Sequence, residues 1–497
     1  MERVEIVEDD GEPFDDRPLD LAAEDAWTSA VRAWLWRHRG PVVAVVAVLL
    51  IALAGAQTVA VVRDRARSAR LADTPGLIAP VGPDLRVRWT AGPTTAAMLF
   101  GAGYVGGAVV GGTVTAEEGV VLLGLDPTDG TQRWRTVPDV VPTVRVDIPG
   151  WVTCAPAHTR PVTAVCTAYV PADQDVQQAV WVLDPRDGTL LRSAMLPAQT
   201  SVLVADGLVV SAARAGGPET ARWTVTGADA LTGETTWTFT TPPLTVPTRR
   251  EETSRLGSGA GLYLGPTPTG RVTLQAGERY WLLDAHDGTA LRAVRGTPHA
   301  GGVVEGRGDA LLEMAYDSAQ ETPGVLLLPA GRRVPVDGWP LWSAVDDGSV
   351  PEVLLLTAPG GPGGTTLSAR DGRSGDPLWS LPVQPEQSVV LDGRLYVMAQ
   401  DALVAVDLRT GQELWRTRVP SRTIRLATDA ERLLLVGADL TVGAYALGDG
   451  RLLWERDLHD EIRRAASPTA GTLGVQPGEG FPWLVVLLSD ESAVVLG

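Results

Sequence analysis

One short pattern recurs along this chain and constrains its fold more than any other feature. A glycine has an aspartate four residues before it and, in most copies, a tryptophan four residues after it. An apolar, strand-like stretch precedes each aspartate and another follows each glycine, so each copy predicts a β-hairpin closed by an aspartate and by a glycine with positive φ. The turn residues are Asp126 and Gly130, Asp184 and Gly188, Asp229 and Gly233, Asp284 and Gly288, Asp371 and Gly375, Asp407 and Gly411, and Gly450.

The residue four positions after the turn glycine is tryptophan in most copies. Some copies depart from the pattern. Arg192 and Arg292 stand where tryptophan is expected, Ala446 replaces an aspartate, and Gly338 with Trp342 is a candidate degenerate copy. The copies recur at spacings of roughly 36 to 58 residues with further strand-like stretches between them, which is typical of four-stranded propeller blades. The tryptophans are Trp134, Trp237, Trp379, Trp415 and Trp454.

This repeat resembles that of the PQQ-like propellers, the family of quinoprotein dehydrogenases and of an outer-membrane assembly lipoprotein. The resemblance covers most of Arg86–Gly497, and it implies that each repeat tryptophan docks on the neighbouring blade. We expect an all-β propeller of eight blades, with seven as the alternative, because residues 297–382 are hard to divide. We expect the ring to close by pairing of residues 85–91 with the last strands of the chain, which removes exposed sheet edges.

An uncharged apolar stretch runs from Val42 to Val62. As a helix it would span roughly 31 Å, enough to cross a bilayer. We predict an uncleaved signal anchor over residues 41–62; a cleaved signal peptide ending near Ala54-Gly55-Ala56 is the rival interpretation. Residues 1–40 would then be an acidic, mostly disordered cytoplasmic tail with a short amphipathic helix, 63–84 a linker, and 85–497 the propeller.

The chain has two cysteines, Cys154 and Cys166. Strand-like flanks surround a segment containing Pro156 and Pro161, which predicts a hairpin with the cysteines on adjacent antiparallel strands. We predict a disulfide between them; a metal site and two free thiols are the alternatives. A disulfide favours an extracytoplasmic propeller.

We find no catalytic, cofactor-binding or metal-binding constellation in the sequence. The resemblance to quinoproteins implies a quinone and calcium in the central channel, an Asn ligand and a vicinal cysteine pair, but the chain has no Asn and its cysteines are apart. The aspartate pairs such as Asp126 and Asp129 are better interpreted as turn residues than as calcium ligands. The net charge of −18 argues against nucleic-acid binding. We therefore predict a protein that is not an enzyme and has no cofactor.

The sequence predicts a binding scaffold, a single-pass membrane protein that presents its propeller to another envelope protein or to a cell-wall component. Long loops at 241–259 and 457–481 are the candidate surfaces, and Arg249, Arg250 and Arg255 form a basic cluster in the first of them. The alternatives are a transmembrane sensor that signals through its acidic tail and, less favoured, a quinoprotein dehydrogenase.

Overall fold

The structure is a computed structural model of the chain, which divides into two compact parts, Met1–Ala72 and Asp73–Gly497. The predicted tail and membrane span lie outside the described residues, and among those residues no helix is long and apolar enough to span a bilayer. The described residues are 66–67, 71, 74–99, 101–115, 119–139, 151–159, 161–172, 175–197, 200–217, 220–245, 262–267, 270–296, 300–307, 310–315, 324–328, 331–359, 365–420, 423–466, 472–477 and 483–497.

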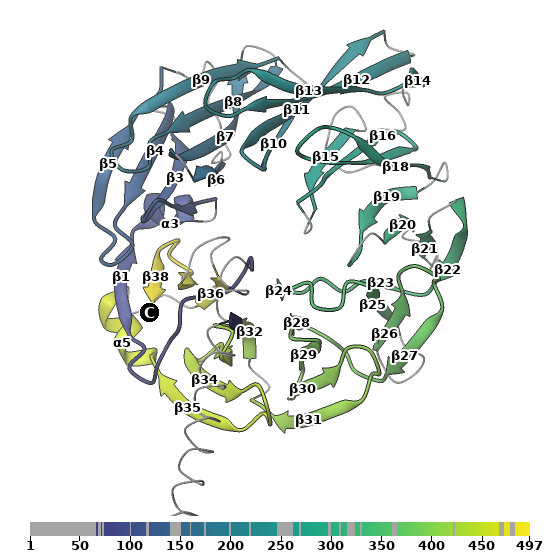
Figure 1. The fold of residues 1–497 in the computed structure, drawn as a ribbon. Coiled ribbons are helices and arrows are strands. Elements are labelled where there is room, and N and C mark those ends of the chain that lie inside the picture. The colour runs from purple at the N-terminus through teal and green to yellow at the C-terminus, as the bar shows by residue number, and fades with distance from the viewer. Residues whose placement is uncertain are drawn as a thin grey trace, which may run out of the picture. The chain divides into compact units, whose positions relative to one another are not determined.

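The part from Asp73 to Gly497 is built from four-stranded antiparallel blades, numbered I to IX in chain order (Figure 1). Blades I to III are β2 (Gly103–Val105), β3 (Ala108–Thr115), β4 (Gly119–Leu125) and β5 (Gln132–Thr136); β6 (Trp151–Thr159), β7 (Val162–Ala172), β8 (Asp175–Leu183) and β9 (Leu190–Leu196); and β10 (Ser201–Ala205), β11 (Leu208–Gly216), β12 (Thr220–Asp229) and β13 (Thr235–Thr240), with β14 (Leu244–Thr245) added. Blades IV to VI are β15 (Leu262–Pro266), β16 (Val272–Ala276), β17 (Arg279–Leu283) and β18 (Ala290–Arg295); β19 (Ala300–Glu305), β20 (Leu311–Ala315), β21 (Gly324–Leu327) and β22 (Arg333–Val336); and β23 (Trp339–Pro340), β25 (Val353–Pro359), β26 (Thr365–Asp371) and β27 (Pro377–Leu381). Blades VII to IX are β28 (Gln387–Leu391), β29 (Arg394–Ala399), β30 (Ala402–Asp407) and β31 (Glu413–Arg418), with β24 (Val345–Asp346) added; β32 (Thr423–Thr428), β33 (Arg432–Gly437), β34 (Thr441–Ala446) and β35 (Leu452–Asp457); and β36 (Thr472–Pro477), β37 (Leu484–Leu488), β38 (Ala493–Leu496) and β1 (Val87–Ala91).

The predicted blade number is wrong. The described residues form eight sheets, one of which joins blades I and II through pairing of β3 with β6, so they hold nine blades. Blade IX has no Asp-turn-Gly copy: Glu491, at φ 64, occupies the left-handed position of its last hairpin. Blade V has a shortened turn in which the Gly331 N–H donates to the Leu328 carbonyl. A count of Asp-turn-Gly copies therefore does not find blade V or blade IX.

The prediction of a degenerate copy at Gly338 and Trp342 is also wrong. Gly338 precedes β23, the first strand of blade VI, and Trp342 follows this strand. A Cβ on Gly338 would lie 2.4 Å from the Thr357 carbonyl oxygen, and its φ is 108°. This glycine is needed for close approach of two strands in blade VI, and no hairpin turn lies there.

Ring closure occurs as the sequence predicts. The strand β1 pairs with β38 from Val87 opposite Leu496 to Ala91 opposite Ala493, so the two ends of the Asp73–Gly497 part complete one blade. Two short helices, α3 (Pro93–Leu99) and α5 (His459–Ala465), lie next to this blade (Figure 1).

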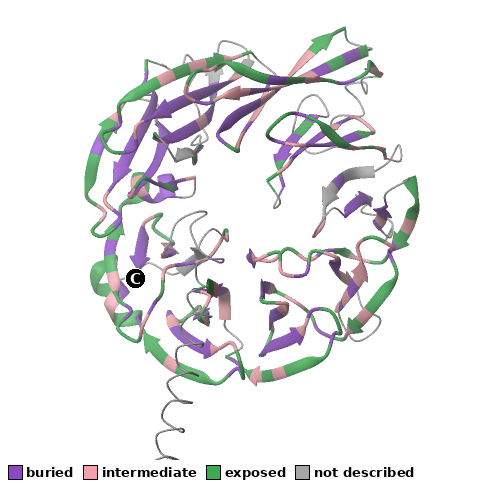
Figure 2. Ribbon diagram, in the orientation of Figure 1, coloured by how far each residue is buried: buried purple, intermediate pink, exposed green. Residues whose placement is uncertain are grey.

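The core lies between adjacent blades and along their middle strands. Every residue of β4 is buried, whereas β9 alternates between exposed and half-buried positions. Figure 2 shows the same contrast around the ring, with buried residues on middle strands and exposed residues on the outermost ones. Successive side chains of a strand point to opposite faces of the sheet, so the apolar middle strands cover both faces of each blade with apolar side chains.

Candidate functional site

The predicted turn residues share one geometry. In each copy the glycine N–H donates to the carbonyl of the residue four positions before it, at 2.9 Å for Gly130 to Asp126. The Asp126 carboxylate also accepts from the Thr128 N–H at 2.8 Å. The glycines of the seven copies have φ between 70° and 76°, a range that disfavours side chains with a Cβ. They are Gly130, Gly188, Gly233, Gly288, Gly375, Gly411 and Gly450.

Each of these glycines also receives a side chain from the preceding blade. Trp134 of blade I covers Gly188 of blade II, where a Cβ would lie 2.3 Å from its Cε3. The Trp134 indole N–H donates to the Pro185 carbonyl at 2.8 Å. Trp237, Trp379 and Trp415 cover the turns of blades IV, VII and VIII in the same way, at Gly288, Gly411 and Gly450.

Three docking residues would not be found by searching for tryptophan after glycine. Arg192 covers Gly233 and donates to the Ala230 carbonyl at 3.2 Å, so a guanidinium occupies the position of the indole. Trp89 on β1 covers Gly130 and donates to the Pro127 carbonyl at 3.2 Å. Val334 covers Gly375. The repeat tryptophans and their substitutes therefore hold successive blades together.

Trp454 differs from the other repeat tryptophans. It packs against the core cluster between blades VIII and IX, and its indole nitrogen is buried without a hydrogen-bond partner among the described residues. Arg292, which like Arg192 stands where the repeat pattern has tryptophan, donates to the Leu327 carbonyl at 2.7 Å. Both side chains therefore serve packing between blades.

The predicted disulfide is present. Cys154 and Cys166 are opposite each other on β6 and β7, with their Cα atoms 4.0 Å apart, and both are buried in the core between blades I and II. A quinone site of the kind the resemblance implies would need a vicinal cysteine pair, and these two residues are committed to a cross-strand bond. The residues present do not fit that cofactor.

Hydrogen bonds lower the pKa of several turn carboxylates. Hydrogen bonds from the Thr128 hydroxyl and from Arg133 lower the pKa of Asp126 to about 2. Hydrogen bonds from Thr189 lower the pKa of Asp187 in the same manner. Within the described ranges no group of three or more His, Cys, Asp or Glu side chains is placed to hold a metal ion.

The loops favoured from the sequence contribute little to a described surface. Residues 246–261, with Arg249, Arg250 and Arg255, lie outside the described residues. The prediction of a long loop at 457–481 is wrong, because this segment contains helix α5 and strand β36 of blade IX. In α5, Glu461 accepts from the Val87 N–H at 2.9 Å and so supports the closing blade.

The most distinctive exposed surface lies elsewhere, on the segment 337–350, which we call the tryptophan loop. It begins before β23 on blade VI and crosses to blade VII, where β24 pairs in parallel with β28. Trp339 is 42% exposed and Trp342 60% exposed. Tryptophan is enriched among the residues that contribute most to binding at protein interfaces, so two exposed indoles on one loop mark a candidate interaction site.

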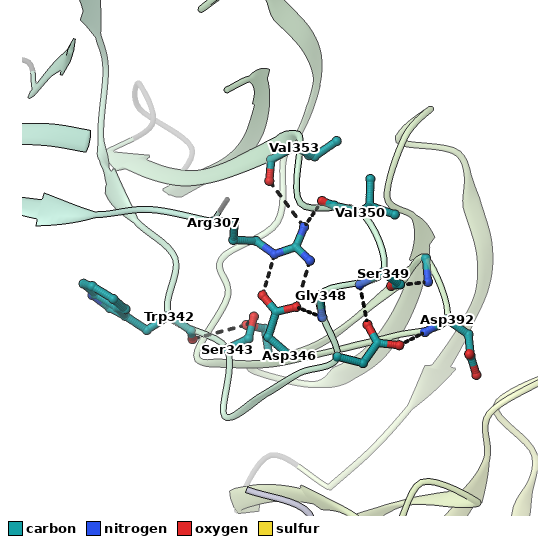
Figure 3. Close-up of polar contacts among 12 residues, drawn as sticks. Arg307, Trp342, Ser343, Asp346, Gly348, Ser349, Val350, Val353 and Asp392 are labelled. Carbon is teal, nitrogen blue, oxygen red and sulfur yellow. Dashed lines mark hydrogen bonds and ion pairs between the residues drawn. The ribbon is translucent and has the colours of Figure 1, made fainter. Parts of the chain in front are cut away.

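An ion pair between a buried arginine side chain and a partly exposed aspartate fixes the base of the tryptophan loop (Figure 3). Arg307, from the loop between β19 and β20 of blade V, has a side chain only 8% exposed and donates from Nε and Nη2 to both oxygens of Asp346, at 2.5 and 2.8 Å. Its Nη1 donates to the Val350 and Val353 carbonyls, at 2.7 and 3.3 Å. This bidentate arrangement is the strong form of the arginine–carboxylate pair.

Further hydrogen bonds tie the loop to blade VII. The Asp347 carboxylate accepts from the Asp392 N–H at 2.7 Å, and the Ser349 hydroxyl accepts from the Gly393 N–H at 2.7 Å. The Ala344 N–H donates to the Ser388 carbonyl at 2.8 Å. In Figure 3, Trp342 points away from this network. The loop is thus anchored to blades V, VI and VII while its indole stays accessible.

The chain passes close to this loop before it reaches β1. A Cβ on Gly76 would lie 2.2 Å from the Ala344 carbonyl oxygen, and the Ile78 N–H donates to the Thr428 carbonyl at 3.1 Å. Further along, residues 80–82 and 84–88, with Thr128 and Gly497, line a cavity of about 430 Å³. The cavity sits at the ring closure, and its lining includes Asp84, Arg86 and Arg88.

No motif in the sequence indicates that Arg307 and Trp342 belong to one site. Arg307 follows a glycine in a short loop of blade V, and its partner Asp346 lies four residues after Trp342, outside the candidate degenerate copy. Trp342 itself is the one available signal, and the sequence pattern places it in a candidate degenerate copy of the repeat.

Among solved structures, BamB from Moraxella catarrhalis is 13% identical, with 83% of this chain and 97% of that chain covered and a TM-score of 0.40. A quinohemoprotein alcohol dehydrogenase from Pseudomonas putida HK5 is 15% identical, covering 84% and 78%, with a TM-score of 0.37. The C-terminal WD40 domain of Sif2 is 10% identical, covering 83% and 98%, with a TM-score of 0.40. No curated protein matches the chain.

A family model described as outer membrane protein assembly factor BamB matches residues 117–304 and 363–479, more than half of the chain. These ranges hold the hairpin turns from Gly130 to Gly288 and from Gly375 to Gly450. The chain therefore belongs to this family of PQQ-like repeat propellers.

Proposed function

We propose that this protein is a membrane-anchored, extracytoplasmic scaffold that binds a partner protein of the cell envelope through the tryptophan loop. The propeller supplies a rigid frame, and the loop presents two indoles on it. Recognition by loops on a rigid frame is the usual arrangement in proteins that bind others.

One observation carries this proposal: Trp342 is 60% exposed on a loop whose base is fixed by the Arg307–Asp346 pair. A mobile loop would lose conformational entropy on binding, which reduces affinity. A loop held by a bidentate ion pair and by backbone hydrogen bonds has already lost most of that freedom. Tryptophan is also among the residues that contribute most to binding energy at interfaces.

Two further observations support the cellular setting. The Cys154–Cys166 disulfide favours an oxidising compartment. The apolar stretch 42–62 is long enough to anchor the chain in a bilayer. Gly76 packs against the tryptophan loop, and the thirteen residues between 62 and 76 allow a separation of at most about 50 Å between those two positions. The proposed partner therefore lies near the membrane or within it.

The binding proposal is tested by cross-linking in cells that express the full chain, followed by affinity purification and mass spectrometry. We expect a defined envelope protein cross-linked to the native chain and lost with Trp342→Ala. The matched control is Tyr169→Ala, because Tyr169 is also 60% exposed but lies on β7 of blade II. Equal recovery of the partner with both variants would refute the role of the loop.

The anchoring proposal is tested separately. We expect the full chain to remain in the membrane pellet after alkaline carbonate extraction and a chain beginning at residue 74 to be released. Proteolysis of intact spheroplasts should degrade the propeller and spare a tag at the N-terminus. A protected propeller would reverse the proposed orientation, and release of the full chain by carbonate would exclude a membrane-spanning anchor.

A further inference from the structure

The tryptophan loop combines two exposed indoles with acidic side chains. Residues 337–350 contain Asp337, Asp346 and Asp347 and no Arg, Lys or His. Asp346 is neutralised by the buried Arg307. The other two aspartates have no such partner within the loop, and Asp337 is exposed two positions before Trp339.

The acidic character continues onto blade VII. Asp392 is exposed, and its backbone N–H donates to the Asp347 carboxylate at 2.7 Å, so the two acidic residues are adjacent in space. The chain as a whole carries a net charge of −18. The tryptophan loop and the blade VII turn beside it therefore form a negatively charged surface, which attracts cations and repels anions.

This charge distribution discriminates among possible occupants of the loop. Tryptophan also inserts into the headgroup region of membranes, but an anionic bilayer surface would be repelled by Asp337, Asp347 and Asp392. A guanidinium or ammonium group can instead lie over an indole face while a nearby carboxylate pairs with it. Both features of the loop then act on the same ligand.

We propose that the tryptophan loop recognises a basic, extended segment of a partner protein, whose Arg or Lys side chains stack on Trp339 and Trp342 and pair with Asp337, which is exposed two positions before Trp339. This inference rests on the proposed function and specifies the chemistry of its partner. It places cationic side chains on the bound segment near residue 76, where the chain reaches the propeller.

The test uses the full chain in detergent and fluorescein-labelled peptides of alternating glycine and arginine, or of alternating glycine and glutamate, read by fluorescence anisotropy. An acidic protein attracts any cationic peptide, so the deciding variants leave the charge unchanged. Trp342→Leu keeps an apolar side chain but removes the π face, and we expect it to weaken arginine-peptide binding about tenfold, or ~1.4 kcal/mol. Tyr169→Ala should have no effect.

A second variant examines the acidic side chains. Asp337→Asn should weaken arginine-peptide binding and reduce its dependence on salt, because it removes one exposed charge. Thermal unfolding checks that each variant is folded; if Trp342→Leu unfolds, Trp339→Leu replaces it. Unchanged affinity in the tryptophan variants, preference for the glutamate peptide, or binding to anionic vesicles in place of the arginine peptide would overturn the inference.

These outcomes are distinct from failure of the proposed function. A partner whose cross-linking depends on Trp342, combined with no arginine-peptide effect in the leucine variant, leaves the scaffold in place and rejects the basic segment. Arginine-peptide binding that depends on Trp342, combined with no cross-linked protein in cells, supports the chemistry of the loop and rejects the scaffold role.

Discussion

Replacing Gly188 by alanine tests how the blades are joined. The turn glycine has φ 72°, and a Cβ there would lie 2.3 Å from Cε3 and 2.5 Å from Cδ2 of Trp134. The indole has no space to retreat, because it is buried and its N–H is bonded to the Pro185 carbonyl at 2.8 Å. The substitution therefore adds a steric conflict to an unfavourable backbone conformation.

Two contributions make up the expected loss of stability. A side chain in the left-handed region costs about 1–2 kcal/mol, and overpacking of a buried contact costs about 1–3 kcal/mol. We expect Gly188→Ala to lower the free energy of unfolding by about 2–5 kcal/mol. Gly107→Ala is the matched control, because Gly107 has φ 81° but a Cβ there would meet nothing within 4 Å. The control should lose about 1–2 kcal/mol.

Urea denaturation followed by circular dichroism provides the measurement. The double variant Trp134→Ala with Gly188→Ala completes a cycle: once the indole is removed, alanine at 188 should cost only the backbone contribution, about 1–2 kcal/mol. Equal losses for the variants at 188 and 107, or strict additivity in the cycle, would refute the conclusion that docking side chains require the turn glycines.

Three further predictions concern other contacts. Arg307→Met removes the ion-pair partner of Asp346, whose side chain is 27% exposed and still accepts from the Gly348 N–H. It should destabilise the protein by about 1–3 kcal/mol, with faster proteolytic cleavage in the tryptophan loop; cleavage at the native rate would contradict the role of Arg307 in fixing the loop. Replacing Cys154 and Cys166 together by serine removes the disulfide and should lower the free energy of unfolding by about 3 kcal/mol on the chain-entropy model. Two free thiols in the native protein, detected by mass spectrometry under non-reducing conditions, would show that the disulfide is absent. Because the folded-state pKa of Asp126 is lowered from 3.8 to about 2, its stabilisation is complete above 3.8 and lost as pH falls toward 2; thermal unfolding of Asp126→Asn should vary less over this window, and equal variation would count against the turn hydrogen bonds.

Much of the candidate site could not be predicted from sequence. The repeat pattern places Trp342 only in a candidate degenerate copy, and no sequence motif indicates a role for Arg307. The pairing of Arg307 with Asp346 joins residues 39 positions apart, on different blades. No local pattern encodes such a contact, because the two side chains meet only after the blades between them have taken their places in the ring.

Local turn chemistry by itself determined the hairpins of this protein. An aspartate that accepts from the next N–H groups and a glycine that adopts positive φ act within five residues, and so do the alternating apolar strands beside them. The cross-strand position of Cys154 and Cys166 follows from the same short-range rules, and these features could be predicted before any coordinates existed.

Tertiary structure decided the rest. The number of blades depends on whether blades without the repeat pattern can fill the ring. Packing accepts Glu491 in place of a turn glycine in blade IX and a shortened turn at Gly331 in blade V. Packing between blades likewise accepts Trp89 and Arg192 in equivalent positions, because each covers the next turn and donates to a carbonyl there. The physical reason is that the blade number and the docking residues depend on contacts between distant segments. In these contacts the shape of a side chain and its hydrogen-bond donor matter more than its place in a local pattern.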